Sequence, residues 1–405
     1  MRILHTSDWH LGQHFMGKTR IIEHAAFLDW LVAQVEHHQI DAVLVAGDIF
    51  DTGTPPSYAR ELYHNFVVAM SRTGASLVLL GGNHDSVAML NESRALLGAL
   101  NVQVIPGALA EPEQQLITLA NRAGEPSAVL CAIPFLRPRD LLESRAGDSA
   151  DDKGRALQQA IAGHYQDLFE RAQDRCAALG GELPIVATGH LTTVGASSSD
   201  SVREIYIGTL EAFPASAFPA ADYIALGHIH RPQKVGGCEH IRYSGSPLAL
   251  GFDETGQQKE VLLVELTPSG LQEVTPVPVP VFQPLARVTG SLAELEHRLP
   301  EAAAMSTAER PVWLEVTVTE DDYLSDLQPR VQALCEGLNV EVLLVRRGRH
   351  ERSATLVAEQ KETLSELTPE QVFERRLAAE ELAPDEHAEL NGLYARIVAD
   401  LKEQA

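Results

Sequence analysis

The chain has 405 residues and a mass of 44.1 kDa, which at roughly 150 residues per domain predicts two or three domains. Its 45% hydrophobic and 22% charged residues are typical of a globular protein and exclude a collagen-like or disordered chain. No apolar run reaches the ~18 residues of a membrane span and no secretory signal is recognisable, so we expect a cytoplasmic protein. The formal net charge of −24 opposes a free-standing nucleic-acid binder, because phosphate neutralisation needs basic surface.

Short apolar runs alternate with helical patterns over most of the first 270 residues, which predicts an α/β fold. Glu23–His38 is the first expected helix, because Phe27, Leu31 and Val35 repeat on one face. The expected strands are Arg2–Thr6, Ala42–Ala46, Ser76–Leu80, Ala128–Ile133, Ile185–Thr188, Tyr223–Leu226, Val261–Leu266 and Leu271–Val274.

Thr275–Pro284 contains four prolines and predicts an extended linker that ends the first domain at residue 274, because alternating prolines cannot fill a central strand. Beyond it we expect a small α/β domain over residues 285–350. Its β-α-β-α-β elements are Leu285–Val288, Leu292–Leu299, Val312–Val318, Leu324–Leu338 and Val340–Val345. Residues 351–405 are expected to form a helical tail, because Leu390, Leu393, Ile397 and Leu401 repeat at helical spacing.

Polar motifs directly follow the expected strands of the first domain. Asp8 and His10 are two residues apart, so in an extended segment both side chains point the same way and can grip one ion. The later motifs are Gly47–Asp51, Gly82–Asp85, Gly189–His190 and Gly227–His230. Because strand ends at one edge of an α/β sheet face one crevice, we expect these side chains to converge, with glycines allowing close backbone approach.

The resulting donor set holds carboxylates, imidazoles and one amide, which suits Mn²⁺, Fe²⁺ or Zn²⁺ rather than a thiolate zinc site. Seven candidate ligands are too many for one ion, so two metals that share a carboxylate are expected. The candidates are Asp8, His10, Asp48, Asn83, His190, His228 and His230. A lone Asp or His after a strand is usually a turn residue or a cap, but five such motifs in one series favour a metal centre.

This motif series resembles the calcineurin-like metallophosphoesterase superfamily, whose fold is a two-sheet β-sandwich flanked by helices. Within it, longer stretches look like the nuclease subunits of bacterial DNA double-strand-break repair complexes, which work with an SMC-like ATPase. Those stretches are Thr6–Gly12, Gly47–Gly53, Ile133–Asp140, Gly189–Thr192 and Tyr243–Pro247. The resemblance extends over essentially the whole chain.

The resemblance implies a residue-by-residue assignment of the site. One Mn²⁺ would be held by Asp8, His10, Asp48 and His230, and the other by Asp48, Asn83, His190 and His228, with Asp48 as the bridge. His84 would be a catalytic histidine rather than a ligand, and Asp51 would orient it. The implied activity is Mn²⁺-dependent DNA hydrolysis by a two-metal mechanism, as a 3′–5′ double-strand exonuclease and a single-strand or hairpin endonuclease. Mg²⁺, Fe²⁺ or Zn²⁺ are possible substitutes.

The implied partners are DNA and the ATPase subunit, the latter bound through the C-terminal helices, with a homodimer inside a heterotetramer and a nucleoid-associated location. The acidic net charge is compatible with DNA if Arg137, Arg139 and Arg346–Arg352 form local basic patches; ion pairs within the chain are the alternative. A phosphoesterase for nucleotides or phosphoproteins and a scaffold with an idle metal site remain as alternatives. The second domain and tail argue against the former, and the complete ligand set with His84 against the latter.

Overall fold

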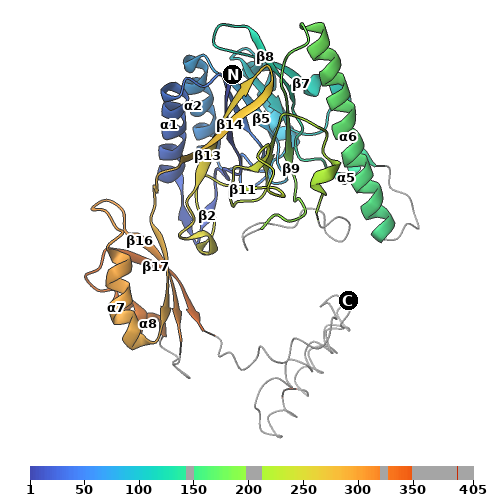
Figure 1. The fold of residues 1–405 in the computed structure, drawn as a ribbon. Helices are drawn as coiled ribbons and strands as arrows, with labels where there is room; N and C mark the ends of the chain where they lie inside the picture. Colours follow the sequence, from blue (N-terminus) through green and yellow to red (C-terminus); the bar gives the residue numbers. More distant parts are fainter. Residues whose placement is uncertain (143–149, 198–211, 320–326, 349–389, 391–405) are drawn as a thin grey trace.

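The computed structural model describes residues 1–142, 150–197, 212–319, 327–348 and residue 390. Its main body is a sandwich of two six-stranded sheets with helices on both outer faces (Figure 1), which confirms the predicted architecture. In spatial order the first sheet contains β14 (Gly270–Pro278), β13 (Glu260–Thr267), β1 (Arg2–Thr6), β4 (Ala42–Val45), β5 (Ser76–Leu80) and β6 (Val102–Ile105). The second contains β11 (Gln233–Lys234), β12 (Ile241–Tyr243), β10 (Tyr223–Gly227), β9 (Ile185–His190), β8 (Pro126–Cys131) and β7 (Leu116–Ala120).

The strands that carry the polar motifs are parallel within each sheet. β1, β4, β5 and β6 run parallel; at one side β13 is antiparallel to β1, and β14 is antiparallel to β13. In the second sheet β8, β9, β10 and β12 are parallel, and the short outer strands β7 and β11 are antiparallel to their neighbours. The carboxyl ends of the parallel strands therefore meet at one edge of each sheet.

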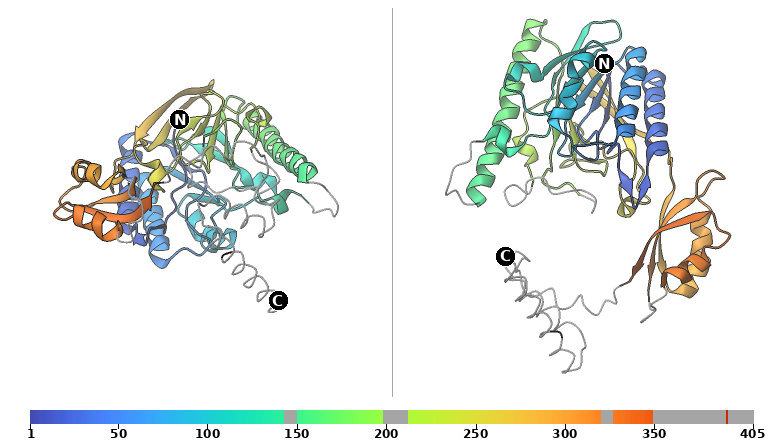
Figure 2. Two further views of the ribbon diagram at one scale, coloured as in Figure 1. Left: turned by 90° about the horizontal axis from the view of Figure 1, so that it is seen from below. Right: turned by 180° about the vertical axis from the view of Figure 1, so that it is seen from behind.

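Helices and apolar strands build three buried layers. α1 (Ile21–His37) and α2 (Ser57–Thr73) cover the first sheet, and α6 (Ala150–Ala178) covers the second (Figures 1 and 2). The predicted stripe of α1 is fully buried against Leu4 and Val43 of the first sheet. Ile3 and Leu44 point to the opposite face and pack against the second sheet. The central strands are thus apolar on both faces, as parallel strands between helices and a second sheet must be.

Shorter elements complete the main body. They are the helices α3 (Val87–Glu92), α4 (Arg94–Gly98) and α5 (Pro138–Leu141), the hairpin β2 (His14–Phe15) and β3 (Lys18–Thr19), and the 3₁₀ turns η1 (Pro112–Gln115), η2 (Ala215–Ala217) and η3 (Phe252–Glu254). Among the described residues no helix is both long and apolar enough to cross a bilayer.

The strand β14 extends into the residues predicted as a linker. Thr275–Pro278 are the last residues of β14, which pairs with β13 and lies at the edge of the first sheet. Pro276 and Pro278 alternate, so both missing N–H groups lie on the same, outer side of an edge strand, where no neighbour needs them. Val279 still donates its N–H to the Lys259 carbonyl oxygen (2.8 Å). The alternating prolines therefore exclude a central strand but not an edge strand.

A separate three-stranded parallel sheet follows, in the order β15 (Leu285–Gly290), β16 (Val312–Val318) and β17 (Val340–Arg347). Its core is covered by α7 (Leu292–Ala303), which begins with a Ser291–Glu294 capping box, and α8 (Leu327–Leu334). The described helix α8 ends four residues before the expected end at Leu338, and residues 324–326 lie outside the described chain. The division into domains at residues 274, 284 and 350 stays a prediction.

An aromatic cluster joins this small sheet to the main body. Phe15 of the β2–β3 hairpin stacks on Trp313 of β16, with ring centroids 5.7 Å apart, and meets Phe252 edge-on at 5.0 Å. Lys18 forms an ion pair with Glu341 of β17 beside it. The predicted helical tail lies outside the described residues except for Leu390.

Candidate metal centre

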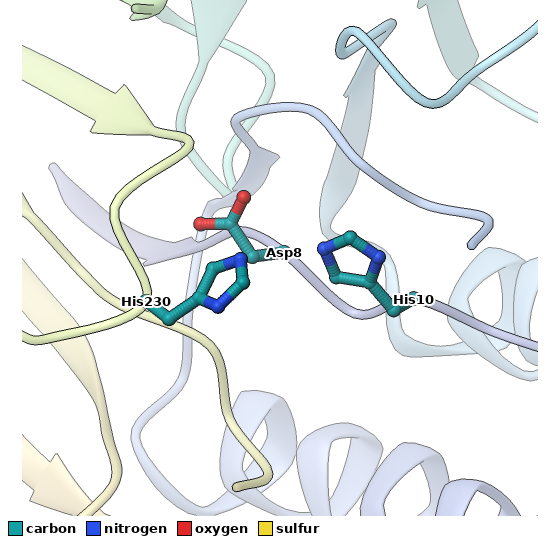
Figure 3. Close-up of side chains that lie close together, drawn as sticks. All are labelled: Asp8, His10 and His230. Carbon is teal, nitrogen blue, oxygen red and sulfur yellow. The ribbon is translucent and has the colours of Figure 1, made fainter. Parts of the chain in front are cut away.

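The predicted site residues meet where the parallel strands of both sheets end. Asp8 and His10 follow β1, Asp48 and Asp51 follow β4, Asn83 and His84 follow β5, His190 ends β9, and His228 and His230 follow β10. The possible ligand atoms of Asp8, His10 and His230, called the first group here, lie within 4.8 Å of one another (Figure 3). The same limit holds for Asp48, His190 and His228, called the second group.

The backbone at these residues is left-handed rather than extended. The φ angles of Asp8, His10 and Asp48 are 54°, 48° and 50°, and that of His228 is 93°. The Asp8–His10 segment is therefore not extended, although both side chains still reach one point. The loops are held by main-chain bonds, from Asp8 N–H to the Gly47 carbonyl (3.0 Å) and from His10 N–H to the Asp48 carbonyl (3.1 Å). Such conformations persist where surrounding contacts impose them, typically at functional sites.

Two glycines allow the segments to approach. A Cβ atom on Gly82 would lie 2.1 Å from Oδ1 of Asp48, and one on Gly227 would lie 2.0 Å from the Ala46 carbonyl oxygen. Neither position tolerates a side chain without moving the backbone. The predicted close approach at these motifs is thus visible in the structure.

In the first group, acidic side chains anchor the imidazoles. His10 donates from Nδ1 to Oδ1 of Asp51 (3.1 Å), and His230 donates from Nδ1 to Oε1 of Glu254 (3.0 Å). Asp8 accepts the His228 N–H at 2.9 Å. Because Nδ1 is used in both rings, Nε2 is the nitrogen left for a metal. Nε2 of His10 is buried and has no hydrogen-bond partner.

In the second group, His190 is anchored by the main chain. Its Nδ1 donates to the Ala46 carbonyl oxygen (2.9 Å), while Nε2 lies 3.2 Å from Oδ2 of Asp48 and 2.9 Å from Oδ1 of Asn83. Nε2 of His228 is buried without a hydrogen-bond partner. The same Asp48 oxygen is 3.7 Å from Nε2 of His10, so this carboxylate stands between the two groups.

The electrostatics match a cluster built around positive charge. Burial raises the pKa of Asp48, but His190 and His10 outweigh burial and bring that pKa well below its ordinary value. Burial lowers the pKa of His190, yet the Asp48 carboxylate dominates and raises it to about 9. Burial and the neighbouring His190 lower the pKa of His228 well below its ordinary value. A neutral His228 is a ready ligand, and a cation could replace the extra proton of His190.

His84 and Asp51 are in contact, but through the Asp51 main chain. His84 donates from Nδ1 to the Asp51 carbonyl oxygen (2.7 Å), and its own N–H donates to Oδ1 of Asp48 (2.9 Å). The Asp51 carboxylate instead accepts from His10. A ligand atom of His84 also lies within 4.8 Å of those of His10 and Asp48. His84 is thus adjacent to both groups, and its predicted role outside the metal ligand set stays a prediction.

Sequence reasoning missed two residues that hold the candidate ligands and their loops in place. Asp85 is buried and accepts the N–H groups of Ile49, Phe50 and Gly82 at 3.1, 2.9 and 2.8 Å, which ties the loop after β4 to the loop after β5. Burial and the nearby Asp48 raise the pKa of Asp85 to about 6. Glu254 was missed as well. Asp85 belongs to a recognised motif and could have been found from it, whereas nothing in the sequence marks Glu254.

Two of the arginines proposed as DNA contacts, Arg137 and Arg346, make contacts within the chain. Arg137 donates to the Asp85 carbonyl oxygen at 3.0 Å, so it supports a site loop. Arg346 pairs with the buried Glu315 at 2.6 Å, although its side chain is 58% exposed. Both contacts correspond to the ion-pair or structural alternative for these residues. Two arginines of the same prediction lie outside the described residues, namely Arg349 and Arg352.

The residues present fit bound divalent cations. Buried polar atoms without a partner are rare in folded proteins, and here two imidazole nitrogens, of His10 and His228, are buried and unpartnered at the site. Carboxylate, amide and imidazole donors converge with no thiolate, which suits transition-metal dications. The arrangement can hold a dimetal centre.

Comparison with known proteins agrees with this site. Residues 1–232 match the family model described as calcineurin-like phosphoesterase, which gives the class of enzyme that the sandwich and its Asp/His cluster represent. Residues 281–381 match the model described as type 5 capsule protein repressor C-terminal domain.

The chain is also similar over nearly its whole length to curated proteins. It is 55% identical over 395 residues to the D subunit of the nuclease SbcCD from Escherichia coli (strain K12), and the match covers 97% of each chain. It is 35% identical to the corresponding SbcCD protein of Rhodobacter capsulatus, over 92% of this chain and 93% of that one. For the Bacillus subtilis protein the identity is 32%, over 80% and 81%. The chain belongs to the family of SbcCD nuclease D subunits, and the predicted class of metal-dependent phosphoesterase is confirmed.

Proposed function

We propose that this chain is a Mn²⁺-dependent DNA nuclease subunit that hydrolyses phosphodiesters at a two-metal centre. The observation that carries the proposal is the position of Asp48, whose Oδ2 lies 3.2 Å from Nε2 of His190 and 3.7 Å from Nε2 of His10. One carboxylate thus faces both ligand groups, as a bridge requires. DNA as the substrate is supported by the 55% identity to a nuclease subunit. The specific activities proposed are 3′–5′ double-strand exonuclease and single-strand or hairpin endonuclease.

The proposed mechanism assigns separate tasks to the chain's own residues. When bound, two cations supply the positive charge that stabilises the phosphodiester transition state. The side chains that would hold them are those of Asp8, His10, Asp48, Asn83, His190, His228 and His230. His84 gives a proton to the departing sugar oxygen or stabilises its charge. The Asp51 carbonyl fixes the His84 ring by accepting from Nδ1, so Nε2 is the nitrogen that acts on the leaving group.

The substrate proposal is tested with purified full-length chain and three substrates: linear duplex DNA, a DNA hairpin and bis-p-nitrophenyl phosphate, with and without the ATPase subunit. We expect Mn²⁺ to support cleavage of all three and EDTA to abolish it. Asp48→Asn is the negative control, because it keeps the size of the side chain and removes the bridging charge. Hydrolysis of the small diester without any DNA cleavage would favour a phosphoesterase for nucleotides or phosphoproteins.

The assembly proposal concerns residues 351–405. We propose that they bind an SbcC-type ATPase, in a heterotetramer with a homodimer of this chain, and that the complex acts on chromosomal DNA in the cytoplasm. Support comes from the predicted apolar stripe Leu390, Leu393, Ile397 and Leu401, which a helix must bury against something, and from the names of the relatives.

Deletion of residues 352–405 tests the assembly proposal. The shortened chain is expected to stay folded, keep its metals and cleave bis-p-nitrophenyl phosphate, but no longer co-purify with the ATPase subunit. Retention of the partner with unchanged affinity would contradict this assignment. Unfolding or aggregation would show that the tail packs on its own chain instead.

A further inference from the structure

One buried ion pair outside the predicted site contacts a candidate metal ligand twice. Glu254 is fully buried in the turn η3 and accepts from Nδ1 of His230 at 3.0 Å through Oε1. Its other oxygen accepts from Nζ of Lys259 at 2.6 Å and from the Leu250 N–H at 3.0 Å. Lys259, also buried, donates to the His230 carbonyl oxygen at 3.0 Å. The pair therefore holds both the ring and the main chain of one residue.

Burial of such an ion pair in the core costs free energy. Taking a carboxylate and an ammonium out of water costs several kcal/mol per ion, and apolar residues of similar size often serve stability as well or better. The presence of the pair is explained if the charge acts on His230. A carboxylate that accepts from Nδ1 fixes the ring orientation and makes Nε2 more basic, which strengthens a metal bond there.

The turn that carries Glu254 is itself anchored. Phe252, two residues earlier, is buried and packs against Phe15 and Trp313 in the aromatic cluster. Ser246 accepts a hydrogen bond from Lys259 at 3.0 Å, so the lysine of the ion pair is held as well. Glu254 therefore has one position available, so that it can impose one orientation on His230.

We propose that Glu254, held in place by Lys259, is the positioning residue for His230 and sets the metal affinity of the first group. The proposal rests on the proposed function, because it requires His230 to be a metal ligand. Glu254 makes no contact with the substrate. It affects only the ion held by the first group, which consists of Asp8, His10 and His230.

The test is calorimetric titration of the metal-free full-length chain with Mn²⁺. The wild-type chain is expected to bind two ions, and Glu254→Gln to bind one of them about 10- to 100-fold more weakly while the other is unchanged. Asp253→Asn is the matched control, because it removes the same charge from the same turn and leaves the Glu254–His230 bond intact. We expect it to titrate like the wild type.

A double variant separates positioning from folding. Glu254→Gln alone leaves Lys259 buried without its carboxylate and can destabilise the chain for that reason. Glu254→Gln/Lys259→Met removes both charges, so the thermal midpoint of the metal-free chain should recover while the weak Mn²⁺ site stays weak. Recovery of wild-type affinity in the double variant would overturn the proposal, because the loss would then come from the unpaired lysine.

His230→Ala in the same titration distinguishes a failure of the Glu254 assignment from a failure of the His230 assignment. If it loses one ion and Glu254→Gln titrates like the wild type, the inference on Glu254 fails and the proposed function stands. If the wild-type chain binds no Mn²⁺, or His230→Ala binds both ions unchanged, the assignment of His230 fails and the inference fails with it.

Discussion

Imidazoles of the two ligand groups are oriented by different parts of the chain, namely side chains in one group and the main chain in the other. In the first group both imidazoles are oriented by carboxylates, Asp51 for His10 and Glu254 for His230. In the second group His190 ends a central strand, pairs with Gly227 in the sheet and is oriented by a main-chain carbonyl. One half of the site therefore depends on side chains from distant loops, and the other on the backbone of the sandwich.

This difference predicts different weaknesses. The loops of the first group lie next to the hairpin and the η3 turn that contact the small sheet, so changes there should affect Asp8, His10 and His230. The second group should instead respond to changes that move strand ends. Asp48 faces both groups, so a substitution at Asp48 should affect both groups alike.

The largest effect is expected at Asp48. Because one carboxylate faces both groups, Asp48→Ala should remove both ions and lower activity by about 1000-fold or more. His230→Ala removes a ligand from the first group only and should retain one ion. Elemental analysis of the two purified variants measures the difference. Equal metal loss would remove the case for a bridging carboxylate.

Substitution of His84 tests whether a residue outside both ligand groups takes part in cleavage. His84→Ala should lower strand cleavage by about 100- to 10,000-fold, because the leaving oxygen loses its proton donor. Both Mn²⁺ ions should remain bound, since no ligand is removed. Metal content and cleavage are measured on the same preparation. A variant that has lost an ion would show that His84 is a ligand.

The backbone of the second group is tested by Gly227→Ala. The new Cβ would lie 2.0 Å from the Ala46 carbonyl oxygen, so the strand ends must separate. We expect activity to fall about 100-fold, because displacement of a site by about 1 Å has that effect. Gly53→Ala is the control, since its Cβ would meet no atom closer than 3.6 Å. Similar activity in the two variants would contradict the backbone argument.

The smallest effect on the site is expected from Trp313→Ala. The substitution removes the stacking partner of Phe15 and should destabilise the fold by about 3–5 kcal/mol, as for other buried aromatic residues. Binding of Mn²⁺ to the first group should weaken by about 0.5–2 kcal/mol, with no change at the second group. Calorimetry resolves the two sites. Equal weakening at both would show that the small sheet acts on the whole sandwich.

Local sequence patterns were enough to predict the central strands and the place of the site. β1, β5 and β16 run over the predicted residues, because an apolar run that ends in a turn motif is a local signal. The motifs after β1, β4, β5, β9 and β10 converge as predicted, since parallel strands bring their carboxyl ends to one edge. The strands β6 and β7 are absent from the predicted set.

The way in which the candidate ligands are held depends on contacts that form only in the folded chain. The left-handed conformations of Asp8 and His10 follow from bonds to the loop after β4, which no local pattern reveals. The prolines of β14 are tolerated because that strand lies at an edge, and edge position is a property of the assembled sheet. Glu254 follows His230 by 24 residues and belongs to no motif. The role proposed for Glu254 depends on its burial beside one imidazole and one lysine, and these contacts exist only once the sandwich has formed.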